Sequence, residues 1–217
     1  MLINNTKQMK NLITIIKKKR VKKFIFVSSS WAGVNIKAPY ALSKKLCERI
    51  LIKSLLSYTI IRPDTLYGVG EWKMETIKKY AKYRIGVIVG SGNYMRSPTY
   101  VYDLIKIFDI TIKQIIKSNN KYKFQKIYDI GSPVPYSQNN IVKLIAKHYK
   151  KSTVMIHAPK FLAGILFTLQ GKLDPKLVRH VEIDRIADIK LIKNDYKIDL
   201  LDFKKGLKYL DHDEYKN

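Results

Sequence analysis

The chain of 217 residues is long enough for one sizeable domain, or for one domain and a small lobe. Its single cysteine, Cys47, excludes a disulfide framework and a cysteine-rich metal site, and it suits a reducing compartment such as the cytoplasm. The formal net charge of +25 allows a polyanionic partner, but only seven of the basic residues are arginines. Because arginine is the side chain that binds phosphates and bases bidentately, no specific nucleic-acid partner is expected.

Helix and strand patterns alternate along the chain. An amphipathic helix is predicted over residues 1–20, where Met9, Leu12, Ile13 and Ile16 recur at helical spacing. Apolar β-rich runs predict strands near residues 23–28, 57–62, 84–92, 126–130 and 153–159. Helical patterns cover residues 40–56, 72–81, 104–116, 137–149 and 199–210, with Ser137 as a cap and Asp103 as a cap or structural acid. This alternation predicts an α/β fold with a parallel sheet.

The most apolar run, residues 161–169, is too short to span a bilayer, which needs about 20 residues. We expect a buried helix of a small lobe here. The alternative is a peripheral membrane contact through residues 161–169, because lysines surround the run.

Three polar side chains are spaced for proton transfer. Tyr40 and Lys44 are one helical turn apart, so they share a face of their helix. A free phenol ionises near pH 10, and a nearby ammonium favours the phenolate. Ser29 follows the 23–27 strand and can reach the same place from its loop. We therefore expect the three to converge in one cleft at the carboxyl ends of the strands, able to move a proton on or off an alcohol oxygen.

Three segments together resemble a known family. They are Phe26-Val-Ser-Ser29, Tyr40-x-x-x-Lys44 followed by Glu48, and Ile61-Arg-Pro-x-x-x-Tyr-Gly68. In this order and spacing they resemble the extended short-chain dehydrogenase/reductases, above all the NAD-dependent epimerases and dehydratases of nucleotide sugars. The loop between Ser29 and Tyr40 is shorter than in many members of that family.

The resemblance implies a fold and a division of the chain. The fold is the C-terminal part of a Rossmann-like doubly wound parallel sheet with a small substrate-binding lobe. Residues 1–217 form a single domain of this type. Residues 1–67 and 99–131 belong to the Rossmann part, and residues 68–98 and 132–217 to the lobe.

The resemblance also implies roles for individual residues. Ser29, Tyr40 and Lys44 are the catalytic residues, and Tyr40, Lys44 and Pro63 contact the cofactor, NAD or NADP. The substrate-binding residues it implies are Thr65, Arg96 and Arg179, with Arg96 facing the cleft from the lobe. The activity implied is 4-epimerisation of a UDP-sugar, with dehydration or reduction as alternatives.

One family feature has no counterpart in the sequence. The family holds the cofactor pyrophosphate with a Gly-x-x-Gly-x-x-Gly turn, whose backbone N–H groups bind the two charges. The 217 residues contain no such turn. We therefore expect a fragment that lacks about a hundred N-terminal residues of the family fold and binds the cofactor poorly.

The alternative functions follow from that expectation. The chain is either a non-catalytic remnant or binding module, or one half of a split enzyme whose N-terminal half is encoded separately. The expected partners are a nucleotide-sugar substrate, that N-terminal half, and a second copy of the chain bound through the 40–56 helix.

Overall fold

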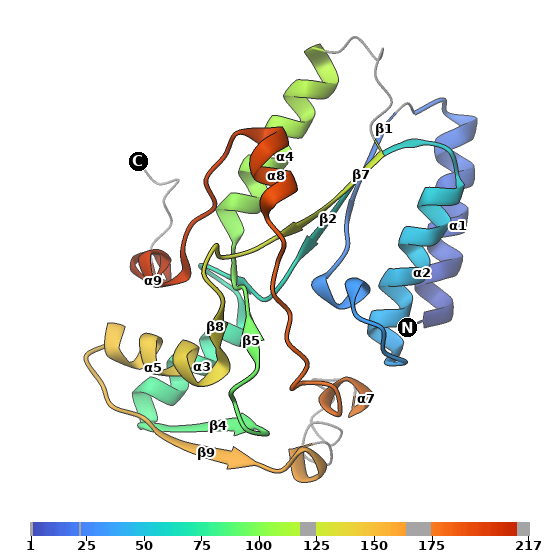
Figure 1. The fold of residues 1–217 in the computed structure, drawn as a ribbon. Coiled ribbons are helices and arrows are strands. Elements are labelled where there is room, and N and C mark those ends of the chain that lie inside the picture. The colour runs from blue at the N-terminus through green and yellow to red at the C-terminus, as the bar shows by residue number, and fades with distance from the viewer. Residues whose placement is uncertain (1, 22, 118–124, 164–174, 212–217) are drawn as a thin grey trace.

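A three-stranded parallel sheet forms the centre of the computed structural model, which describes residues 2–21, 23–117, 125–163 and 175–211 (Figure 1). Its strands are β1 (Lys23–Val27), β2 (Ser57–Pro63) and β7 (Gln125–Ile130), in the order β1-β2-β7. Both strand pairs are parallel, with Phe26 opposite Ile60 and Ile61 opposite Tyr128. The α/β class and the three parallel strands predicted from the sequence are therefore confirmed.

Helices cover both faces of this sheet (Figure 1). Helices α1 (Leu2–Lys18) and α2 (Pro39–Lys53) pack against one face, where their apolar side chains meet those of β1 and β2. Helices α4 (Val101–Lys117) and α8 (Lys190–Tyr196) pack against the other face. Alternate strand residues supply the two cores, as Ile60 and Ile61 do, because successive side chains of a strand point to opposite faces.

A smaller lobe packs beside the carboxyl ends of these strands (Figure 1). It contains α3 (Trp72–Tyr83), α5 (Gln138–His148) and a parallel pair, β4 (Ile85–Val89) with β9 (Val154–Ala158). The last described helical turns, α9 (Phe203–Gly206) and η2 (Leu207–Tyr209), close its core. The remaining short elements are β3 (Leu66–Tyr67), β6 (Thr99–Tyr100), β5 (Met95–Arg96), β8 (Tyr136–Ser137), η1 (Ser30–Gly33) and α7 (Pro175–Val178).

Several boundaries differ from the sequence-based expectation. Helix α2 ends at Lys53, short of residue 56, because Leu55 takes a left-handed backbone conformation with φ 61°. Of the two readings of Asp103, cap or structural acid, the structure supports the second: it is buried in the first turn of α4 and accepts a hydrogen bond from Leu201 N at 2.8 Å. The expected 199–210 helix starts only at Phe203, where Asp202 caps it by accepting from Lys205 N.

One further expectation is confirmed, and another can be followed only in part. Ser137 caps α5 as predicted, accepting from Asn140 N at 3.1 Å. Of the apolar run 161–169, the structure describes only residues 161–163, which are helical; the rest lies outside the described residues. No helix in the described ranges is long and apolar enough to cross a membrane.

A buried ion pair links α2 to the central strand. The Arg62 guanidinium donates from Nε and Nη2 to the two carboxylate oxygens of Glu48, at 2.9 and 2.6 Å. The Glu48 side chain is only 3% exposed, so its charge depends on this partner. The hydrogen bond from Arg62 to Glu48 is also what raises the Arg62 pKa above its ordinary value.

We predict that Arg62→Met lowers the free energy of unfolding by about 3–5 kcal/mol, because it leaves the buried Glu48 carboxylate unpaired. Urea denaturation measures the loss. The control is Lys113→Met, which breaks an exposed pair with Asp109 and should cost about 0–1 kcal/mol. Adding Glu48→Leu to Arg62→Met should recover most of the loss; a double variant less stable than Arg62→Met would contradict this account.

Candidate functional site

Two of the three predicted catalytic residues, Ser29 and Lys44, lie at the carboxyl end of β1. Ser29 follows the strand and its Oγ accepts a hydrogen bond from Trp31 N at 3.4 Å, which caps η1. Lys44 extends from α2 to the same strand end, where its Nζ donates to the Val27 carbonyl oxygen at 3.1 Å. Burial lowers the Lys44 pKa from its ordinary value, and the neighbouring Cys47 and Glu48 oppose that shift.

Tyr40 lies in the first turn of α2 and is half-buried. It packs on a small apolar cluster that contains Trp31, Ile36 and Ala41. Tyr40 therefore lies next to the loop that follows β1, because Trp31 belongs to that loop.

A cavity of about 240 Å³ lies between this loop and the small lobe. Trp31 comes from η1 and Thr65 follows β2, whereas the other walls come from the lobe, from α7 and from the segment that follows α7. Most of the lining is apolar or aromatic, and its polar residues are Thr65, Thr76, Arg96, Gln138 and Arg185. An apolar pocket with a few convergent polar groups is typical of a small-molecule site.

Arg185 is a buried cation of this cavity. It is 8% exposed, its Nη2 lies 3.0 Å from Asp64 Oδ1, and its guanidinium stacks on the Trp31 ring at 3.9 Å. Its Nε is buried and has no hydrogen-bond partner among the described residues. Burial lowers the Arg185 pKa, and Asp64, Tyr94 and Tyr40 oppose that shift, which places Tyr40 within electrostatic reach of this guanidinium.

Asp64 connects the segments that meet at the cavity. Its side chain is 2% exposed and accepts from Ser30 Oγ at 2.9 Å and from Ser97 N at 3.1 Å. With the Arg185 ion pair, one carboxylate thus joins the loop after β1, the loop after β5 and the C-terminal segment.

Arg96 also lines the cavity, but its described donors already have partners. Its Nη1 donates to the Met95 and Ile183 carbonyl oxygens at 2.7 Å, and its Nη2 donates to the Val181 carbonyl oxygen. Its guanidinium stacks on Tyr94 at 4.4 Å. Burial, together with the nearby Arg185, lowers the Arg96 pKa to about 10, so the side chain stays cationic at neutral pH.

The structure thus brings some of the predicted site residues together and leaves others apart. Thr65 and Arg96 line the cavity, and Pro63 is buried at the end of β2. Ser29, Tyr40, Lys44 and Arg179 are not among the lining residues, and Arg179 is exposed. The roles assigned to these residues stay predictions.

Sequence reasoning missed three residues of this site, namely Trp31, Asp64 and Arg185. The only local feature of the sequence that points to Asp64 as a site residue is its position directly after Arg62-Pro63. Nothing in the sequence indicates that Arg185 rather than Arg179 enters the cavity, because the partner that holds Arg185 is distant in sequence. Within the described ranges, no cluster of three metal-ligating side chains is present.

Comparisons with known proteins agree with this fold. Residues 3–85 match a family model described as NAD(P)H-binding. The UDP-glucuronic acid 4-epimerase from Bacillus cereus, solved in complex with NAD, superposes with a TM-score of 0.68 at 18% identity, over 93% of this chain and 64% of that one. The chain has the fold of NAD-dependent nucleotide-sugar epimerases and dehydratases.

Two further solved structures share this epimerase/dehydratase fold. An NAD-dependent NDP-hexosamine 5,6-dehydratase involved in tunicamycin biosynthesis gives a TM-score of 0.70 at 15% identity, over 95% of this chain and 67% of that one. The UDP-glucose 4-epimerase from Thermotoga maritima, solved with UDP-glucose, gives 0.64 at 22% identity, over 92% and 65%. The chain therefore spans about two thirds of the length of these structures. No curated protein sequence matches the chain.

We predict that Asp64 and Arg185 are strongly coupled in stability. A double-mutant cycle with Asp64→Asn and Arg185→Gln should give an interaction energy of about 0.5–3 kcal/mol, because each single change leaves a buried group without its partner. Urea denaturation of the four proteins measures it. The same cycle at the exposed pair Asp109 and Lys113 should give about 0.3–0.5 kcal/mol. Additive effects at Asp64 and Arg185 would show that this ion pair does not hold the segments together.

Proposed function

We propose that the chain carries the substrate pocket and the nicotinamide-side catalytic residues of an NAD(P)-dependent enzyme acting on nucleotide sugars. The observation that carries the proposal is Arg185, a buried guanidinium in an apolar cavity with an unpartnered Nε, within electrostatic reach of Tyr40. A planar guanidinium suits a diphosphate oxygen, and the aromatic walls suit a nucleobase or a sugar ring. The UDP-glucose found in the Thermotoga maritima epimerase is a ligand of this chemistry.

Only one end of a nicotinamide dinucleotide fits the residues of this chain. Ser28 Oγ is buried at the end of β1 without a hydrogen-bond partner among the described residues, and Lys44 Nζ lies at the same strand end. These groups can hold the hydroxyls of the nicotinamide ribose. The sequence offers no glycine-rich turn for the pyrophosphate, so that end needs groups outside these 217 residues.

We propose 4-epimerisation of a UDP-sugar as the reaction. Tyr40 takes the proton from the sugar hydroxyl as its carbon loses a hydride, and Ser29 donates a hydrogen bond to the same oxygen. Lys44 follows Tyr40 by one turn of α2, on the same face of the helix. A nicotinamide dinucleotide bound here would supply the hydride acceptor and donor, and Tyr40 would return the proton to the oxygen when the hydride is delivered to the opposite face of the sugar carbon. Dehydration or reduction by the same residues is the alternative outcome.

A second candidate function is one half of a split enzyme. The observation in its favour is the open edge of the central sheet, since β1 pairs only with β2 among the described strands. A strand from a second polypeptide could pair with β1, and that polypeptide could supply the pyrophosphate turn. A second copy of the chain, bound through α2, is a further partner that we propose for the assembled enzyme.

We predict that UDP binds to the isolated chain and that Arg185→Lys weakens it about tenfold or more. Lysine keeps a charge beside Asp64 but loses the planar fork, and a hydrogen bond to a charged group contributes about 1.5–3 kcal/mol. Titration calorimetry measures the affinity. The control is the exposed Arg179→Gln, which should change it less than about twofold. The reverse ranking of the two variants would place the phosphate contact at Arg179.

We also predict that the 217-residue chain binds NAD very weakly and shows no measurable epimerase turnover. A few hydrogen bonds at the nicotinamide end contribute only about 0.5–1.5 kcal/mol each. A polypeptide that carries the glycine-rich half of the fold, fused or in trans, should restore binding. In the restored enzyme, Tyr40→Phe should abolish turnover and leave cofactor affinity unchanged. Micromolar NAD binding by the chain alone would overturn this prediction, and UDP binding to the cavity would be unaffected by that outcome.

A further inference from the structure

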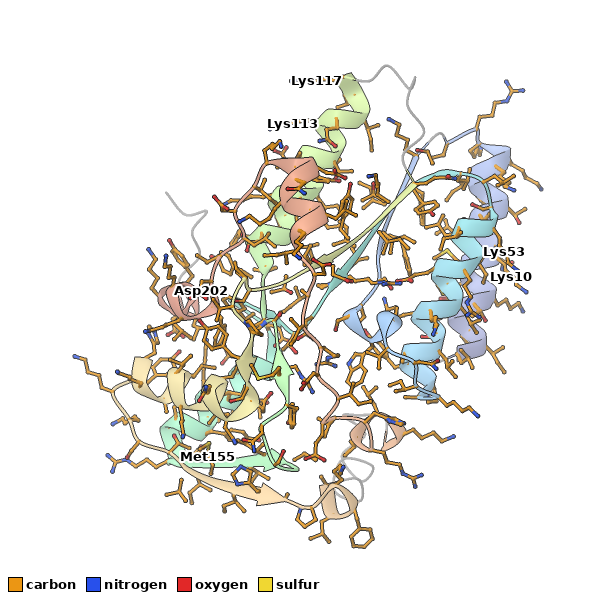
Figure 2. The ribbon with its side chains drawn as sticks, viewed as in Figure 1. Lys10, Lys53, Lys113, Lys117, Met155 and Asp202 are labelled. Carbon is orange, nitrogen blue, oxygen red and sulfur yellow. The ribbon has the colours of Figure 1, made fainter. Side chains whose placement is uncertain are left out.

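The outward face of the β4–β9 pair is apolar, which is unusual for a solvent-facing sheet. Its register sets Ile85 opposite Val154 and Val87 opposite Ile156, so these four side chains share one face. Their exposed fractions are 53%, 68%, 44% and 51% in that order. Met155, labelled in Figure 2, belongs to the alternate set and packs into the core of the lobe. A half-buried pair of strands normally alternates apolar residues inside with polar residues outside.

The turn that follows β9 also carries exposed apolar side chains. Residues 160–163 are helical, and in this turn Phe161 is 73% exposed and Leu162 is 48% exposed. In Figure 1 this turn continues from the end of β9 at the lower edge of the lobe. We call the six side chains Ile85, Val87, Val154, Ile156, Phe161 and Leu162 the β4–β9 apolar face. An exposed contiguous patch of this kind marks a contact with a protein or a membrane.

The charges next to the β4–β9 apolar face are mostly basic, and the acidic exception is Glu182, which pairs with Lys160 at 2.5 Å. The sequence has no aspartate or glutamate over residues 76–93 or 138–163, the segments that contain β4, α5 and β9. The exposed basic residues next to the two strands in sequence are Lys82, Arg84, Lys150, Lys151 and Lys160. The backbone joins Arg84 to the start of β9, because Val154 N donates to the Arg84 carbonyl oxygen at 2.9 Å.

This charge pattern decides between the candidate occupants. Two copies that met through this face would bring like charges together, which destabilises such a contact. An anionic lipid surface satisfies both properties at once, because its headgroups attract the basic rim and its acyl boundary takes up the apolar side chains. We propose that the β4–β9 apolar face docks the protein on the surface of an anionic membrane.

Vesicle co-sedimentation of the full chain tests this proposal. The vesicles are phosphatidylcholine alone, or phosphatidylcholine with about 30% phosphatidylserine. Because a net charge of +25 attracts any polyanion at low salt, binding is compared at about 0.1 and 0.5 M NaCl, where the Debye length falls from about 10 to about 4 Å. We expect binding to the anionic vesicles that persists in part at the higher salt, and weak binding to phosphatidylcholine alone.

The deciding variant is Ile85→Thr/Val154→Thr/Ile156→Thr, which keeps β-branched side chains in the strands and removes the apolar surface. This variant should lower the partition coefficient onto anionic vesicles, measured at the higher salt concentration, about tenfold. The matched control is Ile105→Thr/Ile112→Thr/Ile116→Thr, which changes three exposed isoleucines of α4 and should leave the partition unchanged. Circular dichroism confirms that both variants stay folded.

Three outcomes would overturn the proposal. The first is the absence of salt-resistant binding to the anionic vesicles, and the second is an equal loss in the α4 control. The third is a wild-type dimer in sedimentation velocity that the β4–β9 variant dissociates, together with no vesicle binding. That result would assign the face to a second copy of the chain.

Discussion

The buried carboxylate of Asp64 is the interaction on which the site depends. It accepts hydrogen bonds from Ser30 and Ser97 and pairs with Arg185, so three chain segments converge on two oxygen atoms. A carboxylate with a 2% exposed side chain is costly to bury unless such partners surround it. The loop after β1, the loop after β5 and the C-terminal segment are therefore fixed relative to one another by one charge.

The cavity follows from this arrangement. Arg185 is held against Asp64 on one side and on the Trp31 ring on the other, which leaves its Nε for a ligand. Arg96 has a structural role. Its guanidinium donates to the carbonyl oxygens of Val181 and Ile183 and so holds the C-terminal segment against the lobe. The lobe contributes apolar and aromatic walls, so an anion that enters here meets fixed cations in a poorly hydrated place.

The features that the sequence predicts well are local ones. The apolar runs around residues 23–28, 57–62 and 126–130 become the three parallel strands, and the helical spacing of Tyr40 and Lys44 is realised in α2. The cap at Ser137 could be predicted because its hydrogen bond reaches only three residues along the chain, to Asn140 N. The helix expected to reach residue 56 ends at Lys53, since the backbone at Leu55 turns left-handed, a choice that no propensity indicates.

The features that could not be predicted depend on contacts between distant segments. Asp103 looks like a helix cap from its neighbours, but it binds Leu201 N, which folds back from the C-terminal segment. Arg179 and Arg185 are equivalent as sequence, and only the position of Asp64 and Trp31 selects Arg185 for the cavity. The apolar outer face of β4 and β9 is likewise invisible until the register of the two strands is known.

Chemical-shift mapping of a UDP titration, on the isotope-labelled chain, tests the central claim most directly. The Arg185 Nε–H is buried and has no hydrogen-bond partner in the described part of the chain, and the Trp31 indole lies under the same guanidinium. The account predicts that these two side-chain signals shift first and saturate together with the Ser97 amide, which is bonded to Asp64. Unchanged signals at Arg185 and Trp31 while other parts of the chain respond to UDP would contradict it.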